Sequence, residues 1–103
     1  MPFTILYTTH PDKDTARKIA KKLLEKKLIA CANFFQSSNY YTWEEILRED
    51  KETIALFKLP TQNVEKAEKT ILALHPYDTP CIITLPVTAN KAYEDWLAGC
   101  TKP

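Results

Sequence analysis

The segment ALHPYDTPCIITLPV, residues 73–87, contains side chains that can ligate a metal or move a proton. The residues concerned are His75, Tyr77, Asp78 and Cys81. The same letters also suit the bend between a helix and a buried strand, because a residue that precedes proline disfavours helical backbone. His75 is therefore either a cation at the end of a helix or a metal-binding, titrating group. The spacing alone leaves both interpretations open.

Two further residues can take part in such chemistry. His10 precedes Pro11 at the end of an apolar segment, and Cys31 lies within the apolar run 28–35. A buried, inert cysteine is the usual interpretation of such a position, and a thiolate ligand is the alternative. If the end of the first strand approaches the start of the fourth, His10 shares a neighbourhood with residues 75–81.

A cysteine–histidine nucleophile pair is the enzyme hypothesis, with Cys81 six residues after His75. No third orienting group and no oxyanion donor can be named for it, so we expect no catalytic turnover. The three cysteines include no C-x-x-C pair, which argues against a preformed structural zinc site.

Composition excludes several other classes of function. The 103 residues carry a net charge of +1, which argues against a nucleic-acid-binding protein. An RNA-recognition module needs a glycine-bearing aromatic signature on its third strand, and residues 53–59 contain no glycine. The single glycine, Gly99, excludes glycine-rich phosphate loops. No apolar run approaches the roughly 20 residues that span a bilayer, and no export signal is evident, so we expect a cytoplasmic protein without a membrane segment.

The elements that must position these residues follow from hydrophobic periodicity and from capping residues. We expect strands at residues 3–9, 28–35 with a continuation at 40–43, 53–59 and 81–87. Helices are expected after the capping residues Asp12, Thr61 and Asn90, the last helix covering 91–98 with Gly99 just beyond its end. The polar residues 36–39 predict a bulge, and the charged residues 44–51 predict a segment that holds a turn, with an irregular hairpin as one form of it.

This order, β-α-β-β-α-β with a terminal helix, is the ferredoxin-like pattern of the α+β class, in a single domain over residues 1–103. Two helices cover one face of a mainly antiparallel sheet and leave the other face uncovered. Because the expected strands are apolar on both faces, we predict that the chain forms an oligomer.

Together these stretches resemble the CutA family of divalent-cation tolerance proteins, from Leu6 to about Lys102. The motifs that carry the resemblance are YTTHPD (7–12), LIACAN (28–33), YTW (41–43), LHPYDTP (74–80) and AYEDWL (92–97). The resemblance implies a homotrimer of ferredoxin-like subunits held by strand pairing, similar to the PII signalling proteins. It also implies a role in tolerance to copper and other divalent cations, with Cu(II) binding and no obligatory cofactor.

The metal ligands that the resemblance implies are His10, Cys31 and His75. His10 stands where the family has a cysteine, and imidazole suits Cu(II) at least as well as thiolate does. Protons compete for such ligands, so we expect acid to weaken binding.

Three departures from the family's pattern bear on function. Gln36-Ser37 replaces "PG" after the second strand, Glu45 replaces a glycine of the hairpin, and Cys81 replaces the acid of "PEI" near a subunit cleft. The alternative function is a PII-like regulatory module that binds a small molecule or partner protein in that cleft, lined by Trp43, Tyr77 and Asp78. A third possibility is a structural or anchoring trimer that binds neither class of ligand.

Overall fold

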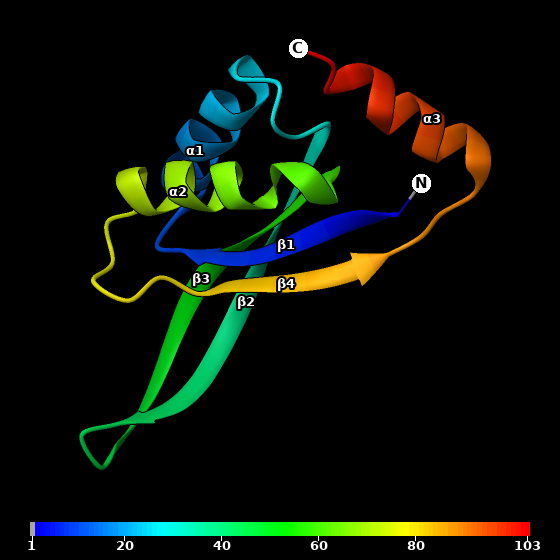
Figure 1. The fold of residues 1–103 in the computed structure, drawn as a ribbon. Coiled ribbons are helices and arrows are strands. Elements are labelled where there is room, and N and C mark those ends of the chain that lie inside the picture. The colour runs from blue at the N-terminus through cyan, green and yellow to red at the C-terminus, as the bar shows by residue number, and fades with distance from the viewer. Residues whose placement is uncertain (1) are drawn as a thin grey trace.

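The computed structural model describes residues 2–103 and has the expected α+β architecture, a ferredoxin-like sheet with two helices on one face and a third at its end (Figure 1). The elements are β1 Phe3–His10, α1 Lys13–Glu25, β2 Cys31–Trp43, β3 Ile46–Pro60, the 3₁₀ helix Thr61–Asn63, α2 Val64–Leu74, β4 Ile82–Val87 and α3 Lys91–Cys100. All strand pairs are antiparallel, in the order β2-β3-β1-β4. No helix within residues 2–103 is long and apolar enough to cross a membrane.

The core lies between the sheet and the helices α1 and α2. Asp12 caps α1 as predicted, because its carboxylate accepts the Thr15 N–H at 2.8 Å. Apolar residues of α1 and α2 pack against Leu6 and Phe57, which pair across β1 and β3 and are fully buried. This packing shows which side chains of the sheet face the helices: in β1 they are those of the even-numbered residues.

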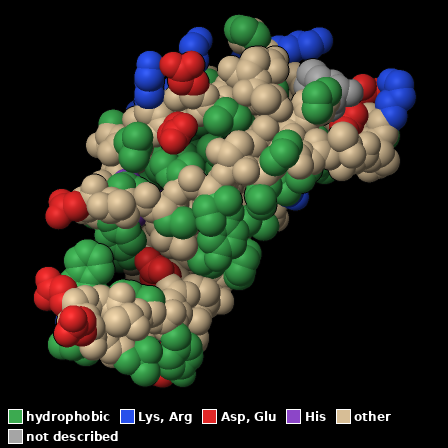
Figure 2. Space-filling model, turned by 60° about the horizontal axis from the view of Figure 1, so that its bottom comes forward, with side chains coloured by type: hydrophobic (Ala, Val, Ile, Leu, Met, Phe, Trp, Pro, Cys, Tyr) green, Lys and Arg blue, Asp and Glu red, His purple; other side chains and the backbone are tan. Residues whose placement is uncertain are grey.

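The opposite face of the sheet is apolar and largely uncovered, as the sequence predicts. Tyr7 pairs with Leu56 on one side and with Ile83 on the other, so these three side chains project away from α1 and α2. Ile83 and Leu85 are 47% and 41% exposed, and Figure 2 shows hydrophobic side chains gathered on the side that carries them. We call this surface the open face. Helix α3 reaches one end of it, where the ring of Tyr93 lies 6.2 Å from that of Phe3.

Strands β2 and β3 form a hairpin longer than the sequence predicts. Pairing runs without interruption from Cys31 opposite Lys58 to Trp43 opposite Ile46. The predicted bulge at residues 36–39 is therefore wrong, and β2 begins at Cys31 rather than at residue 28. The turn predicted within residues 44–51 is present at Glu44 and Glu45, but residues 46–51 belong to β3. The polar residues of this stretch satisfy one another across the hairpin, so their polarity does not end the strands.

The ends of three elements also differ from the prediction. Thr61 does not cap α2, because its hydroxyl bonds that of Thr4 and a 3₁₀ turn intervenes before the helix. Helix α3 continues through Gly99 to Cys100, with Thr101 as its C-cap, so Gly99 needs no left-handed conformation. Strand β4 begins one residue later than predicted, and Pro86 is accommodated because β4 is an edge strand, as expected.

The turn of the hairpin holds two glutamates in a conformation that favours glycine. Glu44 and Glu45 have φ of 51° and 65°, the signs that a two-residue hairpin turn of type I′ requires. We predict that Glu45→Gly stabilises the protein by about 0.5–1 kcal/mol, because glycine adopts positive φ without the steric penalty of a Cβ. Urea unfolding at fixed protein concentration measures the gain. Glu49→Gly, within β3, is the control and should destabilise; a loss of stability in Glu45→Gly contradicts the prediction.

Candidate functional site

Two histidines meet at one end of the sheet, on the side of the helices. His10 ends β1, and His75 is the C-cap of α2, where Pro76 stops the helix. Their ring centroids lie 5.0 Å apart, and both residues are buried, with His10 at 0% exposure. The topology thus brings His10 to the segment 75–81, as the order of the elements predicted.

Both nitrogens of His75 are occupied by backbone groups. Its Nε2 lies 2.7 Å from the Thr9 carbonyl oxygen, which can only accept, so Nε2 carries the proton. Its Nδ1 accepts the N–H of Tyr77 at 3.2 Å. These two bonds fix the tautomer with the proton on Nε2 and tie the end of β1 to the α2–β4 segment. To bind a metal, it must give up one of these two contacts.

His10 has one nitrogen without a partner. The hydroxyl of Thr8 donates its hydrogen to the Ala55 carbonyl at 3.1 Å, so it must accept from Nε2 of His10, 2.7 Å away. Nδ1 then carries a lone pair, and it is buried without a hydrogen-bond partner. Burial, followed by the nearby His75, lowers the pKa of His10 from 6.5 to about 4. His10 is neutral at physiological pH.

Cys31 lies apart from the histidine pair. It pairs with Lys58, whereas His10 pairs with Thr53, a separation of five positions along β3 or about 17 Å. Cys31 also projects to the open face, because Ala32 next to it faces the helices with Phe57. Within residues 2–103, no three His, Cys, Asp or Glu side chains are close enough to hold a metal. The set His10, Cys31 and His75 therefore does not fit an ion within a single chain.

A second group of polar residues lies near the histidine pair, at the base of the hairpin. The Tyr77 hydroxyl donates to Oε2 of Glu52 at 2.7 Å, and Asn39 donates its amide N–H to Oε1 of the same carboxylate. Tyr41 donates to Asp50. We call the surrounding cavity of about 540 Å³ the acidic hollow; its lining residues are Thr9, Pro11, Tyr41, Asp50, Lys51, Glu52, Tyr77, Thr79 and Cys81.

The electrostatics of the acidic hollow favour protonated phenol and thiol groups. Burial and the Glu52 carboxylate raise the pKa of Tyr77 and the pKa of Cys81. Although Cys81 replaces the acid expected from the family's pattern, Glu52 supplies a carboxylate close to that position. A cation placed among these groups would oppose both pKa shifts.

The cleft residues predicted from the resemblance lie together. Trp43, Tyr77 and Asp78 line a second cavity of about 400 Å³ beside the acidic hollow, and Tyr77 belongs to both. Sequence reasoning missed Glu52 and Asp50, which fell within or beside the segment predicted to be a turn. Alternate residues of a strand share a face, so Asp50 and Glu52 lie on the same face of β3 as Ile54, which is the open face. This two-residue spacing could have identified them from the sequence.

The structural class is a ferredoxin-like α+β domain. One apolar face of its sheet is largely uncovered, and an acidic hollow lies at the base of its long hairpin. Comparison with known proteins then gives the family: the profile of the CutA1 divalent ion tolerance protein matches residues 4–100. The chain belongs to this family.

Individual relatives agree with this assignment. The divalent-cation tolerance protein CutA of Pyrococcus horikoshii is 43% identical over 99 residues, covering 95% of this chain and 97% of the relative. That of Thermococcus kodakarensis is 40% identical and covers 95% of both chains. The crystal structure of CutA1 from P. horikoshii superposes with a TM-score of 0.91 at 42% identity, covering 97% of this chain and 99% of that one. These relatives are named for cation tolerance, not for a catalysed reaction.

Proposed function

We propose that the protein acts in divalent-cation tolerance as a homotrimer, and that it binds Cu(II) or a similar ion at the acidic hollow with donors from a neighbouring subunit. The names of its relatives support the cation-tolerance role. The observation that carries the location is the Glu52 carboxylate, which Tyr77 and Asn39 hold in place beside Cys81.

The donor chemistry of the hollow suits a divalent ion. Glu52 and Asp50 offer carboxylate oxygens, and Cys81 offers a sulfur that an ion could deprotonate. A divalent ion commonly takes four or more ligands, and the described part of one subunit gathers too few. A neighbouring subunit must therefore complete the coordination, which makes assembly a condition of binding.

The open face supports assembly. Ile83 and Leu85 on it are largely uncovered, and in the described part of the chain the outer edges of β2 and β4 have no strand partner. In a closed ring of three subunits, the β2 edge of each subunit pairs with the β4 edge of the next. Such a ring buries the exposed apolar side chains and leaves no strand edge unpaired. In such a ring the open faces turn toward one another and the hollow lies near the boundary between subunits.

Calorimetric titration with Cu(II) tests the location. We predict that Glu52→Gln and Cys81→Ser weaken binding about ten- to a hundredfold at pH 7, because each removes a charged or soft donor. Glu49→Gln, a carboxylate of the same strand outside the hollow, is the matched control and should bind as the unmodified protein does.

The same series of variants tests the ligand set that the family resemblance implies, His10, Cys31 and His75. If His10→Gln and Cys31→Ser weaken binding while Glu52→Gln does not, the ion lies at the histidine pair with a cysteine from another subunit, and the proposed location is wrong. If no variant responds but small anions or nucleotides raise the melting temperature, the PII-like regulator is favoured instead. We also propose a cytoplasmic location, although the solved relative from Archaeoglobus fulgidus is described as periplasmic.

A further inference from the structure

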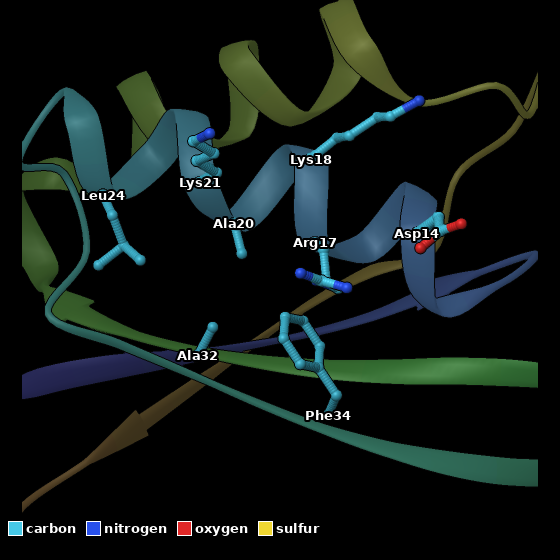
Figure 3. Close-up of a pocket in the computed structure, with 8 residues that line it drawn as sticks. All are labelled: Asp14, Arg17, Lys18, Ala20, Lys21, Leu24, Ala32 and Phe34. Carbon is cyan, nitrogen blue, oxygen red and sulfur yellow. The ribbon is translucent and has the colours of Figure 1, made fainter.

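A groove on the helix side of the sheet has no part in the proposed function. It lies between α1 and the outer strand β2 and has a cavity volume of about 540 Å³ (Figure 3). Ala20 and Leu24 of α1 and Ala32 and Phe34 of β2 face one another across it. Leu24 is 45% exposed, which is high for a leucine beside the core.

The groove is apolar inside and cationic at its rim. Arg17, Lys18 and Lys21 line it along the helix, against a single acid, Asp14. Figure 3 shows the Arg17 side chain directed from α1 toward Phe34, into the groove. Within residues 2–103, neither Arg17 nor Lys21 forms a salt bridge, whereas Lys22 on the same helix pairs with Glu25. A guanidinium without a partner beside an apolar floor is suited to a carboxylate that carries an apolar body.

We propose that this groove binds a small amphipathic carboxylate, with the carboxylate on Arg17 and the apolar body along Ala20, Leu24 and Phe34. Arg17 and Leu24 are seven residues apart, a span of about 10 Å along the helix axis, which sets the length of the apolar body. Charge selects the anion, and the apolar floor selects against small hydrophilic anions. The site is separate from the acidic hollow, because the two cavities share no lining residue.

Decanoate is the probe, titrated into the full-length protein by calorimetry, with amide chemical-shift mapping to locate it. We expect decanoate to bind more tightly than decanol or acetate and to shift amides of α1 and β2. Arg17→Ala should weaken the binding of decanoate about ten- to a hundredfold, because it removes a charge-assisted hydrogen bond, and should leave the affinity for decanol unchanged. Ala32→Leu, which fills the groove, should abolish the binding of both.

Lys13→Ala is the matched control: it removes one cation from α1 at a position outside the groove. Decanoate binding that falls equally in Lys13→Ala and Arg17→Ala would reflect net charge alone and overturn the proposal. Binding no tighter than that of decanol also overturns it. So does the absence of binding by either probe, which is the result expected if a neighbouring copy of the chain fills the groove. Cu(II) titration of Arg17→Ala should be unchanged, so failure here leaves the proposed function untouched.

Discussion

Lowering the pH from 7 to 4 is expected to reduce the free energy of unfolding by about 3 kcal/mol through His10 alone. In the unfolded chain His10 binds a proton near pH 6.5, whereas in the folded protein it does so only at about pH 4. Between these values the unfolded state binds more protons, so acid favours unfolding. The contribution is fully present above pH 6.5, is lost as the pH falls to about 4, and changes no further below that.

The physical cause is burial without an acceptor for the added proton. Nδ1 of His10 has no hydrogen-bond partner, and the protonated ring would lie 5.0 Å from His75 in a site that water does not reach. Urea unfolding at fixed protein concentration, repeated from pH 4 to pH 7.5, measures the effect.

His10→Gln isolates the contribution of this residue. Glutamine keeps a polar group near Thr8 but does not titrate, so the pH dependence between 4 and 6.5 should flatten relative to the unmodified protein. The pKa of Asp12 is lowered mainly by its bonds to Thr15, which the His10→Gln change leaves in place, so its contribution near pH 4 is common to both proteins. An equal slope in both proteins would show that His10 is not the group responsible.

The fold was largely predictable because its signals are local. Ala16, Ile19 and Leu23 recur at helical spacing after the capping Asp12, and all three are buried as that spacing requires. The meeting of His10 with His75 followed from the order of the elements alone. The prediction that failed was the length of the hairpin strands. Ser37 and Asn39 are polar, and sequence alone does not reveal that Glu52 across the hairpin accepts hydrogen bonds from both.

The candidate site was harder to predict because it depends on pairing register. A strand's alternation says that neighbours face opposite sides, but not which side faces the helices. Only the pairing of Leu6 with Phe57, and of Phe57 with Ala32, assigns Cys31 to the open face and His10 to the opposite one. The same register places Glu52 on the open-face side, where it becomes the centre of the acidic hollow.

The largest effect on assembly is expected from a charge on the open face. Ile83→Asp places a carboxylate at its centre, beside Tyr7, where a trimer would bury it without a partner. Burying an unpaired charge costs several kcal/mol per subunit, so we predict that the variant is monomeric. Sedimentation equilibrium should give about three times the 11.9 kDa chain mass for the unmodified protein and the single-chain mass for the variant.

Leu72→Asp is the matched control, since Leu72 is 51% exposed on α2, away from the open face, and its change should leave the trimer intact. Circular dichroism must show that Ile83→Asp keeps its secondary structure. A trimeric Ile83→Asp variant, or a monomeric unmodified protein, contradicts the prediction. Assembly and metal binding are linked in this scheme: monomeric Ile83→Asp retains Glu52 and Cys81, yet it should lose tight Cu(II) binding because the neighbouring subunit's donors are absent. If the monomer binds Cu(II) as tightly as the trimer does, the ion needs no second subunit.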